Sequence, residues 1–201
     1  MIIKSLAHPK TDDIRQALFA EGKHSHFHKT GHEVPQQGSE YVELRNVTFE
    51  CDKNFIIDAP EYENLSSLLW YAQNYEPLIM HQVPNVINKL VADIDTRQAI
   101  LQFYDADENT GNDMICTMYV SLRLDKTDGS PYILTYTVHM RSSDVREFRS
   151  DLRWHKQVAN SIIKELSHKF GQDVWLKPIV WYADSLQCWD KDWEFLKKKE
   201  E

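Results

Sequence analysis

Three segments predicted to be β-strands, two of them joined by a tight turn, restrict the possible fold of this chain most strongly. Residues 98–104, 114–124 and 132–141 are rich in β-branched and aromatic side chains, and both of their alternating faces carry apolar residues. The turn between the last two contains Asp128-Gly129, a pair typical of β-hairpins, which predicts antiparallel neighbours. A long helix is expected over 151–170, ending before Gly171. Such a sheet needs one face covered, so we predict an α/β (α+β) layered domain, a large mixed sheet backed by helices.

The other periodic segments fit the same single unit. Strands are expected over 41–51 and 174–182, and helices over 11–20, 64–72 and 84–94. With 201 residues, the chain is long enough for one sizeable core and short for two. No internal repeat or linker interrupts it. The sequence therefore predicts one domain over 1–201, with a charged tail at 190–201.

Composition excludes several classes of partner. Lys and Arg total 23 against 31 Asp and Glu, a net charge of −8, which argues against a broad grip on nucleic acid. No segment approaches the roughly 20 apolar residues of a membrane span, and residues 1–10 lack the apolar core of a signal peptide. We expect a cytoplasmic protein that binds neither nucleic acid nor membrane. Its three cysteines, Cys51, Cys116 and Cys188, form no CxxC pair, so a disulfide framework is not expected.

A His-rich polar stretch at 21–38 is expected to be a loop. It carries His24, His26, His28 and His32, and neutral imidazole is a common metal ligand. No Cys or carboxylate stands at a familiar zinc spacing, however. A solvated loop is the preferred interpretation, and metal binding is kept as an alternative.

Three motifs in a fixed order, spread over residues 41–189, resemble one enzyme family. They are Asp95-Thr96-Arg97-Gln98-Ala99 before a strand, Ile115-Cys116-Thr117 in the next, and Met140-Arg141-Ser142-Ser143-Asp144-Val145 ending the third. Together they resemble the thymidylate synthase and deoxycytidylate hydroxymethylase superfamily. The resemblance implies a thymidylate synthase-like fold, a pyrimidine nucleoside monophosphate substrate, and 5,10-methylenetetrahydrofolate as cofactor.

The resemblance also assigns roles to individual residues. Cys116 matches the nucleophile that adds to pyrimidine carbon 6, and a nucleophilic thiol needs nearby cations to form its thiolate. Arg141 and Ser142 match the phosphate-binding residues, and a guanidinium fork suits phosphate. Asp144 matches an aspartate that contacts the folate ring and the site's waters. Arg97 matches an arginine that reaches the partner subunit's phosphate site, which implies a homodimer.

Asp151 lies near the position that reads the base in this family. That position is Asn in enzymes acting on uracil and Asp in those acting on cytosine, because a carboxyl group accepts from cytosine's exocyclic amine. The match requires the turn at 146–150 to be one residue shorter than the family's. An equally good interpretation makes Asp151 a simple helix N-cap.

Several positions depart from the family pattern. The family's general-base glutamate corresponds to Ser67, and Glu63, one helical turn earlier, could replace it. Gln98 stands where a second phosphate-binding arginine is usual, and the phosphate-loop arginine is missing around 36–38. Gln187 and Trp189 replace the His and Tyr that hold the sugar hydroxyl. The chain also stops about a dozen residues after Trp189, whereas the family continues into a segment that closes over folate.

Three functions remain open at this point. The preferred one is a folate-dependent hydroxymethylase acting at carbon 5, most simply on deoxycytidylate, because adding water demands less site closure than hydride transfer. The first alternative is a degenerate relative that binds nucleotide or acts as a regulatory subunit. The second is a thymidylate synthase acting on deoxyuridylate.

Overall fold

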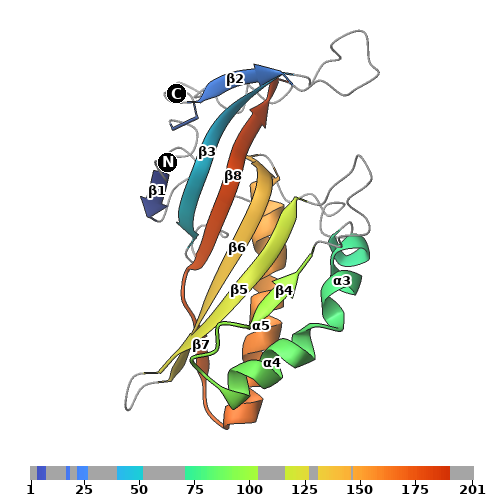
Figure 1. Cartoon of the computed structure of the whole chain (residues 1–201), viewed down its shortest axis with the longest axis vertical. Helices are drawn as coiled ribbons and strands as arrows, with labels where there is room; N and C mark the ends of the chain where they lie inside the picture. Colours follow the sequence, from blue (N-terminus) through green and yellow to red (C-terminus); the bar gives the residue numbers. More distant parts are fainter. Residues whose placement is uncertain are drawn as a thin grey trace, which may run out of the picture.

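One mixed sheet organises the structure. The computed structural model describes residues 4–7, 17–18, 22–26, 40–51, 71–103, 116–126, 131–145 and 147–190. Within these ranges eight strands form one sheet, whose main path runs β1-β3-β8-β6-β5-β4 (Figure 1). The strands are β1 (Lys4–Ala7), β2 (Lys23–His26), β3 (Glu40–Cys51), β4 (Ile100–Gln102), β5 (Thr117–Asp125), β6 (Tyr132–Asp144), β7 (Val174–Leu176) and β8 (Ile179–Trp189).

The pairing of the central strands combines both directions. β5 and β6 form the antiparallel pair predicted from the Asp128-Gly129 turn. β8 then lies between β6, to which it is parallel, and β3, to which it is antiparallel. The expected mixed sheet is therefore confirmed, with β8 and β6 at its middle.

Helix α5 (Phe148–Phe170) covers part of one sheet face. Phe148, in its first turn, packs on Phe49 of β3 and Trp181 of β8, with ring centroids 5.5 and 5.1 Å away. The helix ends at Gly171, whose φ of 64° is the left-handed conformation that glycine adopts without strain. Two further helices, α3 (Glu76–Met80) and α4 (Val83–Ala92), contact β4, and α4 also packs on α5.

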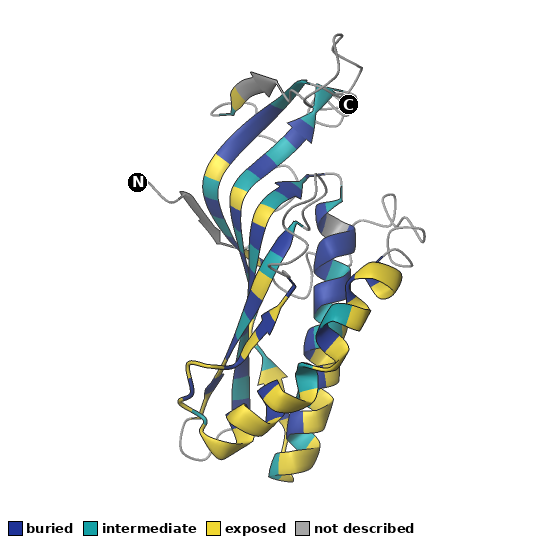
Figure 2. Ribbon diagram, turned by 45° about the vertical axis from the view of Figure 1, so that its right-hand side comes forward, coloured by how far each residue is buried: buried dark blue, intermediate teal, exposed yellow. Residues whose placement is uncertain are grey.

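Along the central strands buried residues alternate with more exposed ones (Figure 2), and the set of alternate positions that is buried changes partway along. Where α5 covers the sheet, the inward positions are apolar: Val47, Phe49, Trp181, Ala183, Tyr136 and Val138. Beyond the first turn of α5, the positions buried on β3, β8 and β6 belong to the opposite face: Val42, Leu44, Leu186, Cys188 and Val145. The N-terminal segment packs there, because a Cβ on Gly22 would meet Val42 at 2.2 Å. Each half of the sheet is thus covered from a different side.

Several boundaries differ from the sequence prediction. Residues 23–26, expected within a loop at 21–38, form β2 and pair antiparallel with β3, while β1 was not predicted. Such short edge strands are set by pairing with β3 rather than by their own propensity. Helix α5 begins at Phe148 rather than 151, so Asp151 is not its N-cap, and the N-cap, Glu147, makes no side-chain capping bond.

The final predicted strand, 174–182, is two strands. β7 pairs with β6, and β8 runs to Trp189, so Gln187 lies inside a strand. Of the predicted helices at 11–20 and 64–72, only residues 17–18 and 71–72 are described, and they are helical. The tail after 190 lies outside the described residues. No described helix has the length and apolarity to cross a membrane.

Candidate active site

Cys116 lies where the hairpin strands β5 and β6 bring it beside two residues of the MRSSD motif. The Ser142 hydroxyl donates a hydrogen bond to Cys116 Sγ at 3.3 Å, and Arg141 Nη2 lies 3.9 Å from the same sulfur. The Arg141 amide also donates to the Cys116 carbonyl at 2.8 Å. Cys116 is half-buried, whereas Cys51 and Cys188 are buried in the core. The structure therefore brings the predicted nucleophile and both predicted phosphate ligands together.

Tyr75 is a site residue that the sequence analysis missed. Its side chain is only 2% exposed, and burial raises the pKa of its hydroxyl to about 12. The hydroxyl hydrogen-bonds Thr117 and the backbone of Cys116. Its ring lies 5.5 Å from that of Trp154 on α5. Tyr75 thus ties the thiol segment to the start of α5, although no motif singles it out.

A polar floor extends the sheet face that α5 covers. In register across β6, β8 and β3, Ser142 is beside Ser185, and Ser185 is beside Arg45. Two residues further along, Asp144, Gln187 and Glu43 line up in the same way. Register partners share a face, and alternate residues of a strand do too. These six residues therefore lie on the face that is apolar under α5, and they begin where that helix begins. We call them the polar floor.

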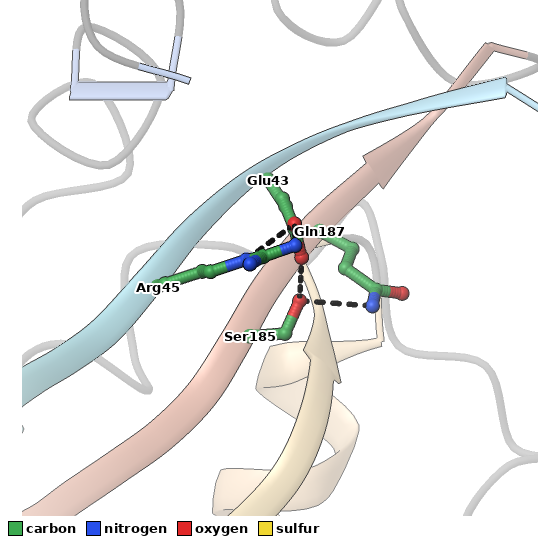
Figure 3. A network of polar contacts seen from close by, with 4 residues as sticks. All are labelled: Glu43, Arg45, Ser185 and Gln187. Carbon is green, nitrogen blue, oxygen red and sulfur yellow. Dashed lines mark hydrogen bonds and ion pairs between the residues drawn. The ribbon is translucent and has the colours of Figure 1, made fainter. Parts of the chain in front are cut away.

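Four residues of the polar floor form one hydrogen-bonded network (Figure 3). Arg45 Nε donates to Glu43 Oε1 at 2.6 Å, and the Ser185 hydroxyl donates to Glu43 Oε2 at 2.7 Å. Gln187 Nε2 then donates to Ser185 Oγ at 2.9 Å. Of these, only Gln187 was a predicted site residue. The sequence does contain a sign of these residues. Glu43 and Arg45 are charged, although they stand at alternate positions of the same strand as the apolar Val47 and Phe49.

Asp151 is buried in the first turns of α5. Its side chain is 4% exposed, and Oδ1 has no hydrogen-bond partner among the described residues. Burial raises the pKa of its carboxyl to about 8. One turn later, His155 is fully buried, its Nδ1 lies 3.1 Å from Tyr136 Oη, and burial lowers its pKa to about 3. At neutral pH both groups are uncharged, which is how ionisable groups persist in a core.

Arg97, another predicted site residue, lies far from Cys116 in the same chain. Arg97 is exposed at the far end of β5, because its neighbour Thr96 accepts a hydrogen bond from Arg123. At about 3.3 Å per residue, that end is roughly 20 Å from Thr117. Glu63 and Ser67 lie outside the described residues, as do His28 and His32. Among the residues that the structure describes, no group of three or more His, Cys, Asp or Glu could hold a metal ion.

Comparison with known proteins identifies the fold of this chain. No protein-family profile and no curated protein matches the sequence. Among solved structures, thermostable thymidylate synthase A from Bacillus subtilis is similar, with a TM-score of 0.64 and 10% identity. The match covers 93% of this chain and 81% of that one. The chain therefore has a thymidylate synthase-like fold, as the motifs predicted.

The exposure of the three thiols leads to a first prediction. We expect Ellman's reagent to titrate one thiol in the native protein and three in denaturant, because Cys51 and Cys188 are 3% and 0% exposed. In Cys116→Ser, the native signal should disappear and two thiols should react after denaturation. Rapid reaction of a second native thiol would contradict the packing of β3 and β8.

The buried carboxyl leads to a second prediction, on stability. The pKa of Asp151 is about 8 in the folded protein and 3.8 in the unfolded chain. Between these pH values the folded protein therefore retains a proton that the unfolded chain loses. The free energy of unfolding should therefore fall as pH rises from 4 to 8. Asp151→Asn removes this dependence and should be more stable than wild type at pH 8, by on the order of a few kcal/mol. The difference should shrink toward pH 4.

Urea denaturation at several pH values measures this effect. Asp173→Asn is the control, because Asp173 is exposed near the other end of α5. An Asp151→Asn curve parallel to that of wild type would show that Asp151 is ionised in the folded protein.

Proposed function

We propose that the protein is a folate-dependent hydroxymethylase that acts at carbon 5 of a pyrimidine nucleoside monophosphate, with deoxycytidylate as preferred substrate. The observation that carries the proposal is the contact of Cys116 Sγ with the Ser142 hydroxyl and its approach to the Arg141 guanidinium. A thiol with a cation and a hydroxyl donor beside it is suited to form a nucleophilic thiolate. The thymidylate synthase-like fold supports this proposal, although a fold alone does not define an activity.

In the proposed reaction, Cys116 is the nucleophile. Its thiolate adds to carbon 6 of the ring, which gives carbon 5 nucleophilic character. Carbon 5 would bond to the one-carbon unit and release its proton to water, and the bond between that carbon and the folate nitrogen would break, so that tetrahydrofolate leaves. Water would then add its hydroxyl to the transferred carbon, and departure of the thiolate would restore the ring double bond. Arg141 and Ser142 would hold the phosphate, so that binding the nucleotide places carbon 6 against the sulfur.

Other residues of the site would position the ligands. Gln187, on the polar floor, would contact the sugar, and Asp151 the exocyclic amine of the base. The unpartnered Oδ1 of Asp151, on the α5 turn next to Trp154, supports the base-reading role. Asp144 is half-buried on the same polar floor, and its carboxylate fits the N–H donors of a pterin ring. The cofactor 5,10-methylenetetrahydrofolate would supply the one-carbon unit there. Glu63 would act as the general base.

A second candidate function is nucleotide binding without carbon transfer. It is favoured by the positions that depart from the family pattern, among them Gln98, Gln187 and Trp189. A regulatory or assembly subunit would need nothing more than the phosphate and sugar contacts. Thymidylate synthesis from deoxyuridylate is the remaining alternative.

Tritium release from carbon 5 tests the proposal directly. Wild type should release tritium from labelled deoxycytidylate faster than from deoxyuridylate, and methylenetetrahydrofolate should increase the yield of modified nucleotide. Cys116→Ala should abolish release, a loss of at least about 100-fold. Cys188→Ala is the matched control, because that thiol is buried away from the site. Binding of either nucleotide without release would favour the non-catalytic candidate, and full turnover by Cys116→Ala would refute the mechanism.

We further propose that the active form is a cytoplasmic homodimer that pairs through the sheet face opposite α5. That face is half-exposed on β6 and its neighbours, with small and aromatic side chains at Thr48, Ser121, Thr135, Thr137, His139, Val180 and Tyr182. The Tyr119 and His139 rings stack there at 4.1 Å. A partner would also explain how Arg97, remote from Cys116 in its own chain, could reach a phosphate.

Light scattering after size-exclusion chromatography tests this assembly. Wild type should elute with twice the chain mass of 23.7 kDa. Thr137→Arg should give a monomer, because it buries an unpaired charge at the centre of the face. Asn88→Arg, on the exposed side of α4, should leave the dimer intact. A monomeric wild type would rule out this part of the proposal.

A further inference from the structure

Glu43 is a carboxylate buried inside a strand, and the described contacts use both of its oxygens. Its side chain is 4% exposed. Oε1 accepts from the guanidinium of Arg45, which is itself 69% exposed, and Oε2 accepts from the Ser185 hydroxyl. A buried carboxylate is costly unless it is paired, so its place on the polar floor calls for a role.

The carboxylate fixes the direction of every hydrogen bond in the network (Figure 3). Paired with Arg45, the Glu43 carboxylate only accepts, so the single proton of the Ser185 hydroxyl is committed to it. Ser185 Oγ can then only accept from Gln187, which must present its NH₂ group at 2.9 Å. This reasoning does not depend on how the amide was assigned, since the reverse orientation would place two acceptors together.

The consequence is that the other end of the Gln187 amide, the carbonyl Oε1, points away from Ser185. In Figure 3 this oxygen lies on the side of the side chain remote from the network. Gln187 pairs in register with Asp144, and Ser185 with Ser142, so Gln187 is a diagonal neighbour of Ser142. Strand spacing places their Cα atoms roughly 8 Å apart. A ligand held at Cys116 and Ser142 can therefore reach the oxygen.

We propose that Glu43 is a positioning residue that acts through Ser185, holding the Gln187 carbonyl toward the ligand so that this subsite accepts a hydrogen bond from the substrate's sugar hydroxyl. The inference rests on the proposed nucleotide site and deepens it. The free hydroxyl of a deoxynucleoside 5′-monophosphate is the 3′-hydroxyl, which donates well to a carbonyl. If the relay is broken, the amide can rotate and offer its NH₂ group, which does not require a donor on the ligand.

Binding measured by calorimetry tests the relay. Deoxycytidylate, with its 3′-hydroxyl, is compared with 2′,3′-dideoxycytidine monophosphate and with the 3′-fluoro analogue, which cannot donate. Wild type should bind deoxycytidylate about 3- to 10-fold more tightly than either analogue, the worth of one hydrogen bond. Glu43→Gln should lower the ratio against the 3′-fluoro analogue, because the freed NH₂ group can donate to its fluorine, while leaving affinity for the dideoxy compound unchanged. An amide at position 43 can donate, which frees the Ser185 proton to turn toward Gln187.

Matched variants separate positioning from a general structural role. Glu50→Gln, an exposed position on the same strand, should keep the wild-type ratio. Ser185→Ala breaks the relay without touching the ion pair and should behave like Glu43→Gln, which keeps the test decisive if Glu43→Gln fails to fold.

The failure of this inference differs from failure of the proposed function. Wild-type ratios in both Glu43→Gln and Ser185→Ala would overturn the relay and leave the nucleotide site intact. Equal wild-type affinity for all three nucleotides would also overturn the relay alone. If wild type bound none of them, the proposed function and the inference would fall together.

Discussion

Helix α5 contacts the central strands of the sheet over only part of their length, and this limit determines where the candidate site lies. Phe148 packs on Phe49 and Trp181 at the start of the helix, and beyond that point no described helix covers this face. Three central strands continue past it. Their inward positions therefore change from apolar to polar at the same level: Ser142 and Asp144 on β6, Ser185 and Gln187 on β8, Glu43 and Arg45 on β3. The hydrophobic effect places apolar side chains under α5, and the polar side chains beyond it can contact a ligand.

The sequence predicted the elements whose pattern is local. The hairpin came from its turn, and α5 from its period and terminating glycine, because these features are set within a few residues. β1 and β2 were missed, since strands of four residues depend on β3 for their pairing. The start of α5 was placed three residues late because Asp151 resembles a capping residue, whereas Glu147 at the true N-cap makes no side-chain capping bond.

The residues of the candidate site also divide into those that the sequence predicted and those that only the structure reveals. Cys116, Arg141 and Ser142 were predicted from the motifs of the family that the sequence resembles. The structure brings them into contact because Cys116 directly precedes β5, which pairs with the strand that carries Arg141 and Ser142. Glu43 and Ser185 lie 142 positions apart in sequence and meet only because β3 pairs with β8. A charged residue in an alternating strand is usually solvated, and only the coverage of each face shows that Glu43 is buried. Tyr75 was missed for the same reason.

A β-bulge near the start of β5 lets the chain hold Cys116 at the site while the rest of the strand packs under α5. The register with β6 shifts between Thr117 and Tyr119, so Thr117 faces inward with Met140 and bonds its sulfur at 3.2 Å. A regular strand would give Thr117 the opposite parity to Val120 and Leu122, which are both buried. The bulge restores that parity, and it holds Thr117 against the Tyr75 hydroxyl. Cys116, one residue earlier, is thereby fixed at the edge of the polar floor, with Ser142 as its neighbour.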